Sequence, residues 1–520
     1  MIVLSTLNAR YSHCSFGLRY LYANLKDLQA QAQIIEFTIS QNARDIAEAI
    51  LALNPKIVGF GVYIWNTRQT HDVVSLLKKL RPELRIILGG PEVSFETASQ
   101  DICKTADLTI QGEADFLLYD VCNDFLSNAR WPSQKYVSGP LPEIKQIALP
   151  YEFYSDDDIR NRIIYVEASR GCPYKCEYCL SSLDKAVRNF DVDIFLVEMD
   201  LLIKRGARQF KFVDRTFNLS ASISSQILTF FLERVSLGLF LHFEMVPDRL
   251  PVELRNLIEK FPAGSLQFEV GIQTWNADVA KLVSRRQDYF KIEENFAYLT
   301  AHTGVHLHAD LIAGLPSETI ESFAIGFDAV AALRPQEIQV GILKRLKGTP
   351  IIRHDQEWQM TYQEHPPFQV LETRTMSFET LQRIDRFAYF WNLIGNSGNF
   401  VRTMKLLSDL SQQRPEQSLF WEFDELSRFL SKRHPQRSGV ALLNLLESVW
   451  VYLTNQRGVD SALMRDILVT DYTSVVRRDI PAFLRKDALR EGTESSEPYA
   501  GPATPRRQRQ HLQSTATKLH

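Results

Sequence analysis

Cysteine is scarce in this chain, which has only six among 520 residues. So few thiols cannot build a dense disulfide framework, and the opening Met-Ile-Val-Leu leads into a strand-like run rather than a signal peptide. We therefore expect a cytoplasmic protein in a reducing compartment, where closely spaced cysteines indicate metal binding. Cys14, Cys103 and Cys122 stand alone in the sequence and are expected to be ordinary buried thiols.

A strong charge of either sign is also lacking. The chain has 59 basic and 62 acidic residues, a net charge of −3, so its charge gives no indication of a nucleic-acid partner. No apolar run approaches the roughly 18–20 residues that cross a bilayer, so no membrane span is expected. With 45% hydrophobic residues the chain can bury large cores, and its length predicts about two to four domains.

The remaining three cysteines lie close together. Cys172, Cys176 and Cys179 form a Cys-x3-Cys-x2-Cys run in the segment Gly171-Cys-Pro-Tyr-Lys-Cys-Glu-Tyr-Cys-Leu180. Thiolates are soft ligands that suit iron–sulfur clusters or zinc. Both kinds of site usually take a fourth protein ligand, and no fourth cysteine lies nearby in the sequence. The run therefore indicates either a cluster with one iron left open or a three-cysteine zinc site completed by a distant histidine.

The N-terminal third alternates short apolar runs with helical periodicity. The pattern predicts strands at 1–6, 56–63 and 85–88, and helices at 16–25, 42–53 and 69–80. This order is typical of an open doubly wound sheet, which binds ligands at the carboxyl ends of its strands. Gly59, Gly61, Gly89 and Gly90 stand at such strand ends, although single glycines there are often only turn formers.

Strands and helices continue to alternate through the middle of the chain, and helices follow. Strands are predicted at 162–167, 209–213, 240–245, 265–272, 305–312 and 337–343, at the intervals of a β/α barrel. Beyond about residue 356 the periodicity is helical, at 381–393, 399–409, 419–432, 441–454 and 461–470. Most aromatic residues of that region are expected at helix interfaces, with a role in covering a substrate as the alternative. The last thirty or so residues are rich in Gly, Ser, Pro and Thr, which predicts a disordered tail.

The cysteine spacing, with aromatic Tyr178 before the last cysteine, resembles the radical S-adenosylmethionine (SAM) superfamily. The strand that leads into the cysteine loop resembles the start of that superfamily's partial (β/α) barrel. In these enzymes the open iron of a 4Fe-4S cluster binds the amino and carboxylate groups of SAM. One electron from the cluster then cleaves a C–S bond and gives a 5'-deoxyadenosyl radical. The resemblance implies Cys172, Cys176 and Cys179 as metal ligands and SAM as a second cofactor.

Polar residues near the carboxyl ends of the predicted barrel strands fit the same resemblance. Asp214 follows one strand in Val213-Asp-Arg-Thr-Phe-Asn218, where similar enzymes approach the SAM amino group, although a charged residue at a strand end is commonly only solvated. Glu244 lies near the end of the next strand. Glu269 and Gln273 belong to a Glu-x-Gly-x-Gln pattern of this branch and project to one face of an extended chain. The resemblance implies that these four residues orient SAM.

A doubly wound domain ahead of a radical SAM loop resembles a cobalamin-binding domain. The corrin-contacting loops of that family correspond to segments 8–17, 62–66, 88–92 and 111–114. The resemblance implies these contacts to cobalamin: Asn8, Arg10, Tyr11, Gly61, Tyr63, Gly89, Gly90, Pro91, Glu92, Gly112 and Glu113. The Asp-x-His-x-x-Gly motif that supplies a lower axial histidine is missing, because Tyr11 stands two residues before His13. The alternative is a degenerate flavodoxin-like module that binds no ligand.

The resemblance covers roughly residues 1–350, and the segment 339–350 is similar to a poorly characterised subgroup of the cobalamin-binding branch. It implies methylation of an unactivated carbon on a small-molecule or peptide substrate, with a reductant such as flavodoxin or ferredoxin. Non-methylating cobalamin chemistry, methylthiotransfer to tRNA or protein, and a non-catalytic binding module are the alternatives. The expected domains are a cobalamin-binding Rossmann-like domain (1–140), a radical SAM barrel (141–355), a mostly helical domain (356–487) and a disordered tail (488–520).

Overall fold

The computed structural model describes residues 1–184, 186–436, 438–474, 480–481 and 483–484, and these form two compact units. The first unit contains Met1–Arg215 together with two later segments, Lys344–Arg353 and Tyr362–Gln369. The second unit contains Thr216–Leu343 and the rest of the C-terminal half. The predicted tail from residue 488 lies outside the described residues.

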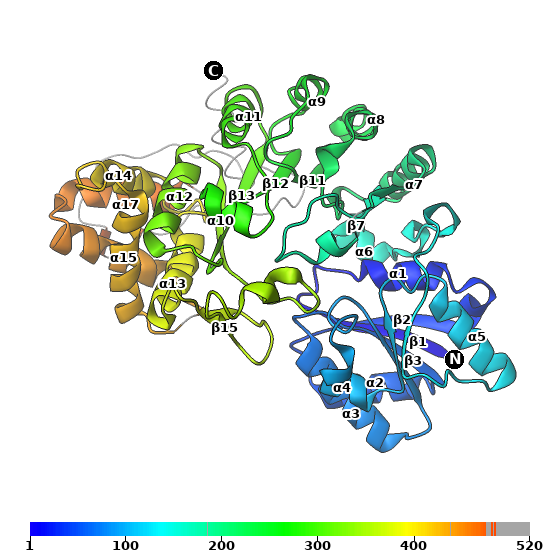
Figure 1. Cartoon of the computed structure of the whole chain (residues 1–520). Helices are drawn as coiled ribbons and strands as arrows, with labels where there is room; N and C mark the ends of the chain where they lie inside the picture. Colours follow the sequence, from blue (N-terminus) through cyan, green and yellow to red (C-terminus); the bar gives the residue numbers. More distant parts are fainter. Residues whose placement is uncertain (185, 437, 475–479, 482, 485–520) are drawn as a thin grey trace. The chain divides into compact units, whose positions relative to one another are not determined.

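The first unit begins with a six-stranded parallel sheet in the order β2-β1-β3-β4-β5-β6 (Figure 1). Helices connect the strands, as parallel pairing requires, and the order reverses direction at β1, the usual ligand-binding point of such sheets. The elements are β1 (Ile2–Asn8), α1 (Phe16–Ala23), β2 (Ala32–Thr38), α2 (Ala43–Ala52), β3 (Ile57–Gly61), α3 (Thr67–Leu80), β4 (Arg85–Gly89), α4 (Asp101–Thr105), β5 (Leu108–Gln111), α5 (Leu117–Asn128) and β6 (Tyr136–Ser138).

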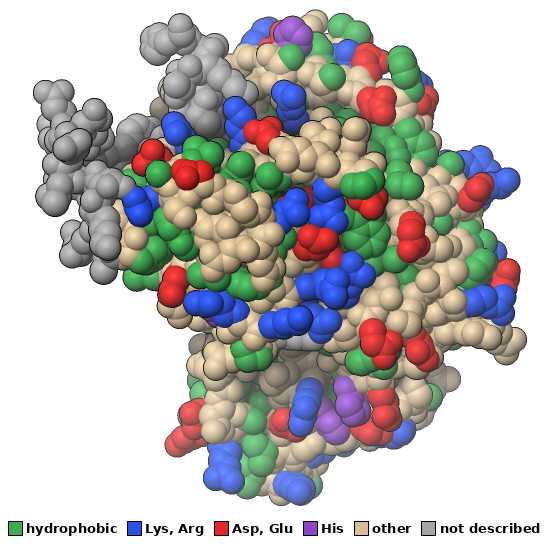
Figure 2. Space-filling model, turned by 90° about the vertical axis from the view of Figure 1, so that its left-hand side faces the viewer, with side chains coloured by type: hydrophobic (Ala, Val, Ile, Leu, Met, Phe, Trp, Pro, Cys, Tyr) green, Lys and Arg blue, Asp and Glu red, His purple; other side chains and the backbone are tan. Residues whose placement is uncertain are grey.

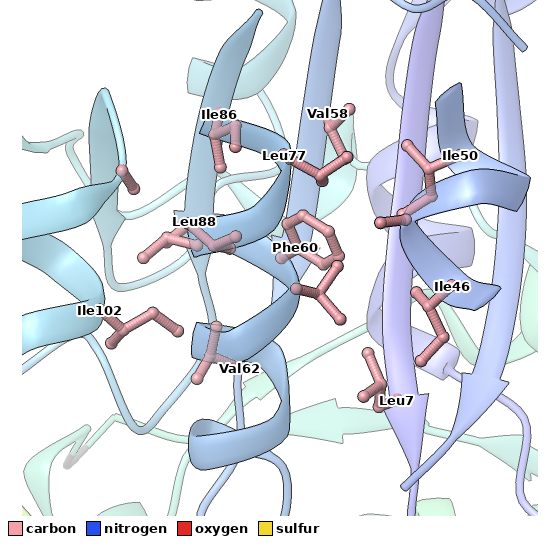
Figure 3. Close-up of a cluster of buried hydrophobic side chains, with 14 of the residues drawn as sticks. Leu7, Ile46, Ile50, Val58, Phe60, Val62, Leu77, Ile86, Leu88 and Ile102 are labelled. Carbon is pink, nitrogen blue, oxygen red and sulfur yellow. The ribbon is translucent and has the colours of Figure 1, made fainter. Parts of the chain in front are cut away.

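The two faces of this sheet are packed differently. On one face, Val58, Phe60, Ile86 and Leu88 pack tightly against α2, α3 and α4 (Figure 3). On the other face, apolar residues of β1, β4 and β5 pack against α1 and α5. There β3 contributes Gly59 and Gly61, which have no side chains to fill the space. The second face is therefore the one with room for a ligand.

The rest of the first unit contains the cysteine loop. The elements are α6 (Asp156–Asn161), β7 (Ile164–Val166), β8 (Ser169–Arg170), β9 (Arg188–Asn189), α7 (Val192–Lys204) and β10 (Gln209–Phe212). Strands β7 and β10 pair in parallel, and β8 and β9 pair in antiparallel. Because β8 and β9 flank the three cysteines, their pairing closes the base of the cysteine loop.

In the second unit, parallel strands lie in the order β14-β13-β12-β11, with helices between them in the sequence. Alternate residues such as Phe243, Phe268 and Leu307 are fully buried, as expected where one face of a sheet is covered by helices. The elements are α8 (Ala221–Leu232), β11 (Phe240–Met245), α9 (Val252–Ile258), β12 (Leu266–Gln273), α10 (Ala277–Leu282), α11 (Tyr289–His302), β13 (His306–Ala313), α12 (Ile320–Ala332) and β14 (Glu337–Ile342).

A group of helices completes the second unit (Figure 1). Short strands β15 (Thr361–Tyr362) and β16 (Val370–Glu372) precede α13 (Phe378–Ile394), α14 (Val401–Ser411), α15 (Leu419–Arg433), α16 (Leu442–Val451) and α17 (Ser461–Thr473). Phe387, Trp391 and Phe423 are buried between α13 and α15, so the predicted placement of these aromatic residues is confirmed. In the part of the chain that the structure describes, no helix is long and apolar enough to cross a membrane.

The predicted fold class is confirmed: a doubly wound first domain, then β/α alternation, then helices. Every predicted strand exists within a few residues of its expected position. Strands β2, β5 and β6 of the first sheet were not predicted, and neither were the short strands β8, β9, β15 and β16. The reason is clearest for β2. This edge strand has only one buried side chain, Phe37, and it lacks the continuous apolar run of the central strands.

Candidate functional site

The cysteine loop is held in shape by its own backbone. The Cys172 N–H donates to the Asp184 carbonyl at 2.9 Å, and the Cys179 N–H donates to the Cys176 carbonyl at 3.1 Å. Gly171 has φ +92°, and a Cβ there would collide with the Ala186 carbonyl, so only glycine fits before the first cysteine. Cys172 and Cys176 are buried and Cys179 is half-buried. Burial raises the pKa of Cys172, and so do the nearby Cys179 and Cys176 thiols.

These three thiols suit an iron–sulfur cluster by their chemistry. Among the described residues, however, no group of three or more His, Cys, Asp or Glu side chains is already arranged as a metal site. The fit therefore rests on the donor set, three soft sulfur ligands in one loop with backbone bonds that fix its ends. Tyr178 lies half-buried between Cys176 and Cys179.

Asp214 lies behind this loop, at the end of β10. Its carboxylate accepts hydrogen bonds from the Ala168 N–H at 3.0 Å and the Ser169 hydroxyl at 2.6 Å, and both donors lead into the cysteine loop. Burial raises the Asp214 pKa to about 7, although these hydrogen bonds favour the charged form. The observed contacts place Asp214 as a support of the loop, and its predicted contact with SAM stays a prediction.

The Asp214 pKa predicts how stability depends on pH. Its folded pKa of about 7 lies above the ordinary aspartate value of 3.8, so the folded state holds the proton more tightly. Asp214 therefore lowers the free energy of unfolding progressively as pH rises from about 4 to 7, and adds no further change above that range. An Asp214→Asn variant lacks this dependence. We expect urea unfolding to show the variant gaining stability relative to wild type between pH 5 and 7, then a constant difference. A difference that stays flat with pH would contradict this pKa.

The polar face of the second unit's strands carries a row of ionisable side chains. Glu244 of β11 is in register with Glu269 of β12, Glu269 with His308 of β13, and His308 with Glu337 of β14. Residues in register on neighbouring parallel strands share a face. The predicted SAM residues Glu244 and Glu269 therefore lie side by side, and the sequence did not indicate that His308 and Glu337 continue their row.

Histidines partner the carboxylates on this face. His242 Nε2 lies 3.0 Å from Glu269 Oε2, and His308 Nε2 lies 3.2 Å from Asp310 Oδ1. Burial alone would lower the His308 pKa, but the carboxylate of Asp310, with Glu337 and Glu269, outweighs it and raises the pKa. The face holds more carboxylates than cations, which favours a positively charged ligand.

Gln273, the last residue of β12, has a strained backbone conformation. Its φ is +71°, and the pairing of β12 with β13 shifts register between Gly271 and Gln273. A Cβ at Gly271 would collide with the Gln273 amide, so that side chain folds back over the glycine. Arg285 donates to the Gly271 carbonyl and supports the bulge. Such strain is often found at binding sites, where a bulge redirects a side chain.

The face of the first unit's sheet that packs against α1 and α5 contains an apolar cavity of about 170 Å³. It lies between the strands and helices α1 and α5, and its walls include Leu4, Leu18, Ile87, Ile110 and Leu118. Glycines at 59, 61, 89 and 90 give it room on the strand side. A Cβ at Gly61 would lie at ordinary contact distance from Thr6 and Tyr63, so only a larger side chain would reach beyond them. This cavity fits a flat or elongated apolar group.

The predicted corrin contacts fall into three groups in the structure. Gly61, Tyr63, Gly89, Gly90 and Gly112 all line the cavity. Arg10, Tyr11 and Pro91 are exposed. Asn8, Glu92 and Glu113 already have polar partners within the protein: Asn8 Nδ2 donates to Glu36 at 2.5 Å, Glu92 pairs with Lys347, and Glu113 pairs with two arginines.

A buried charge network joins this cavity to the cysteine loop within the first unit. Arg170 of β8 lines the cavity and lies two residues before Cys172. Its guanidinium contacts Glu113 at 2.8 Å, Asp115 at 3.0 Å and Glu167 at 2.9 Å. Arg188 of β9 also contacts Glu113, and it contacts Asp184 at 2.9 Å. The two arginines that flank the cysteine loop therefore share one carboxylate, Glu113.

A later segment of the chain, Lys344–Arg353, also belongs to the first unit, and we call it the strap. It contacts the loop that follows β4 and the cysteine loop. Lys347 forms a buried ion pair with Glu92, and Gly348 lies so close to Phe95 that no side chain would fit there. At its other end, the Ile351 N–H donates to the Glu177 carbonyl at 3.0 Å, and Arg353 Nε donates to the Glu177 carboxylate at 2.7 Å. Glu177 lies between Cys176 and Cys179.

Different protein families match different parts of the chain. A B12-binding domain matches residues 3–119, and a radical SAM superfamily domain matches residues 166–325. Residues 356–516 match a family described as a protein of unknown function, DUF4080. The apolar cavity lies mostly in the first match, and the cysteine loop and polar row lie in the second.

Curated relatives match part of the chain. An uncharacterised methyltransferase, PH0819 of Pyrococcus horikoshii, is 26% identical over 39% of this chain and 49% of its own length. The cobalamin-dependent radical SAM methyltransferase TokK of Streptomyces tokunonensis is 22% identical over 59% of this chain and 49% of its own length. The chain thus spans about half the length of these relatives.

Solved structures share the fold at low sequence identity. The radical SAM methyltransferase TsrM of Kitasatospora setae, solved with cobalamin and a 4Fe-4S cluster, has a TM-score of 0.57 and 14% identity over 71% of this chain and 81% of TsrM. The cobalamin-dependent SAM radical enzyme OxsB has a TM-score of 0.61 and 13% identity over 99% of this chain and 83% of OxsB.

Proposed function

We infer that this chain, which carries a B12-binding domain and a radical SAM domain, is a cobalamin-dependent radical SAM enzyme, and we propose that it methylates an unactivated carbon. The observation that carries the proposal is that the apolar cavity and the three-thiol loop belong to one unit and are joined through Arg170. When bound, the cluster and SAM supply a 5'-deoxyadenosyl radical, and cobalamin supplies the methyl group.

Each cofactor has a set of residues suited to hold it. Cys172, Cys176 and Cys179 would bind the cluster through soft thiolates. The glycine-bordered cavity would hold an apolar part of cobalamin, because side chains are missing where that group would lie. Tyr63 and Gly112 lie at the same cavity. The residues thus fit both groups on steric and chemical grounds.

SAM carries a sulfonium and an ammonium group, so its charges suit the acidic row on the second unit's polar face. Glu244, Glu269 and Gln273 would hold it by hydrogen bonds and charge. Fixing SAM in one orientation directs the radical to one carbon rather than to its nearest neighbour. The strained backbone at Gln273 supports this role, because it turns an amide towards the row.

The proposal is tested by reconstituting the protein anaerobically with iron, sulfide and hydroxocobalamin, and adding a low-potential reductant with SAM. We expect release of 5'-deoxyadenosine, and transfer of deuterium from methyl-labelled SAM to cobalamin. Flavodoxin or ferredoxin should replace the chemical reductant. Formation of 5'-deoxyadenosine without labelled methylcobalamin would leave a radical SAM enzyme and contradict methylation.

Filling the apolar cavity should remove cobalamin without removing the cluster. In Gly61→Leu, the new side chain enters the space that cobalamin would occupy, whereas Gly61→Ala adds only a Cβ at ordinary contact distance. We expect Gly61→Leu to lose at least nine tenths of its bound corrin, by absorbance after gel filtration, with unchanged iron. Gly61→Ala is the matched control and should keep most of the corrin. Full corrin retention by Gly61→Leu would contradict this site.

A further inference from the structure

The second unit contains a larger cavity, of about 860 Å³, whose lining shares Glu337 with the polar row. Three elements form it: the outer edge of β14, one face of α13 and the last turns of α15. Among the strands that the structure describes, β14 is the last in the sheet order, so no described strand pairs with its outer edge. Pockets of this size commonly bind small molecules.

The α13 wall is a defined helix face. Asp385, Ala388, Tyr389 and Asn392 line the cavity at i, i+3, i+4 and i+7 spacing, which places them on one side of the helix. Phe387 and Trp391 lie on another side and pack against Phe423 of α15. The helices are thus held together beside the cavity, and the hollow does not result from loose packing.

The α15 wall is basic. Arg428 and Lys432 are one turn apart at the end of the helix, and both are exposed and line the cavity. The helix ends at Arg433 because the next residue, His434, precedes Pro435, which disfavours helical backbone. Figure 2, which views the molecule from the left-hand side of Figure 1, shows several Lys and Arg side chains on that side, with Asp and Glu side chains among them. Arg386 of α13 is the third basic residue of the lining.

Acidic groups offset only part of this charge. Of the two acidic residues in the lining, Glu337 is directed to buried His306, whose Nε2 lies 2.9 Å from its carboxylate. Asp385 is the other. His434 Nε2 contacts the Ser448 hydroxyl at 2.7 Å, and burial with nearby Arg433 lowers the His434 pKa, which favours its neutral form. The lining therefore carries a net positive charge.

The β14 edge adds polar and apolar surface. The Asn396 side chain donates to the Ile338 carbonyl at 2.9 Å and accepts from the Ile338 N–H at 3.0 Å, as a neighbouring strand would. Gln339 and Val340 continue the wall beyond this point. The cavity thus offers apolar contacts for a carbon skeleton next to basic groups for its charged end.

We propose that this cavity binds a small organic anion, whose carboxylate or phosphate group is recognised by Arg428 and Lys432 while Val340 and Tyr389 contact its carbon skeleton. Charged hydrogen bonds from guanidinium and ammonium groups favour both kinds of anion. This proposal does not depend on methyl transfer, and it gives a binding role to the region that follows the barrel strands.

The test is calorimetric titration of the full-length reconstituted protein with glutarate and with methylphosphonate, without substrate or SAM. Wild type should bind at least one of them. The double variant Arg428→Gln, Lys432→Gln should bind at least tenfold more weakly, because each charged hydrogen bond contributes about tenfold or more. Arg433→Gln is the matched control: it lies in the same turn, but its guanidinium contacts Glu447 at 3.3 Å. It should bind as wild type does.

Binding of glutarate alone would identify a carboxylate ligand, and binding of methylphosphonate alone a phosphate ligand; both outcomes support the site. Binding of neither anion would overturn it. Equal weakening by Arg433→Gln would also overturn it, because general surface charge would then explain the affinity. Circular dichroism shows whether the double variant is folded. Its iron content reports separately on the cluster, and so on the radical SAM proposal.

Discussion

Replacing Cys176 with alanine should remove the iron of the reconstituted protein and reduce SAM cleavage to background, while leaving its corrin content unchanged. A cluster held by three thiolates has no spare protein ligand, so two remaining cysteines cannot keep it. The other cysteines do not substitute, because Cys14, Cys103 and Cys122 are buried elsewhere in the first unit. Burial raises the pKa of Cys14 and of Cys122 to about 12, which keeps both as thiols.

Iron and corrin are measured on the same sample, with Cys122→Ala as the control. Wild type and control should each carry about four irons per chain, as one 4Fe-4S cluster requires. The Cys176→Ala variant should show almost none and lack the cluster signal in electron paramagnetic resonance. Zinc in place of iron in the wild type would refute the radical chemistry, and iron retained by Cys176→Ala would refute the ligand assignment.

Replacing Arg170 with alanine should strongly destabilise the first unit. Arg170 faces Glu113, Asp115 and Glu167, and burial raises the pKa of Glu167 even with the guanidinium beside it. Removing one partner of a buried ion pair costs about 3–5 kcal/mol, because the remaining charges stay buried without compensation. Since Arg170 also lines the cavity and precedes the cysteine loop, the variant should lose both corrin and iron.

The control for Arg170→Ala is Lys104→Ala. Lys104 pairs with Asp101 at 2.9 Å, but both side chains are more than half exposed, and such pairs contribute at most about 1 kcal/mol. Thermal unfolding of the cofactor-free protein should show a fall of several degrees for Arg170→Ala and little change for Lys104→Ala. Arg170→Lys should recover only part of the loss, because an ammonium group cannot reproduce the guanidinium contacts. Similar unfolding temperatures for Arg170→Ala and Lys104→Ala would show that the network does not stabilise the unit.

Local patterns predicted much of the fold, because strands such as β3 and β12 are buried and therefore continuously apolar or regularly alternating. Strand β2 could not be predicted in this way, because Gln33 and Glu36 interrupt its apolar pattern at the sheet edge. Spacing also indicated the cysteine loop, since all three thiols lie within eight residues. The buried strands and the cysteine loop are both determined by residues that lie close together in the sequence.

Long-range partners could not be read from the sequence. Resemblance placed Glu92 and Glu113 at the corrin, but the structure pairs them with Lys347 and with Arg170 and Arg188. Lys347 is 255 residues from Glu92, and no local pattern marks such a pair. Similarly, the role of Gly59 and Gly61 depends on the helices opposite them, since the same glycines in a tightly packed face would leave only a small void.

The strap has a consequence for how the protein is made. A fragment that ends at Arg215 would contain every predicted corrin residue and all three cysteines, but it would lack Lys347 and Arg353. During translation, strands β11 to β14 leave the ribosome before the strap does. The contacts of Glu92 and Glu177 with the strap can therefore form only late in synthesis. We expect cofactor insertion to follow completion of the barrel strands, and the B12-binding domain expressed alone to hold its ligand poorly.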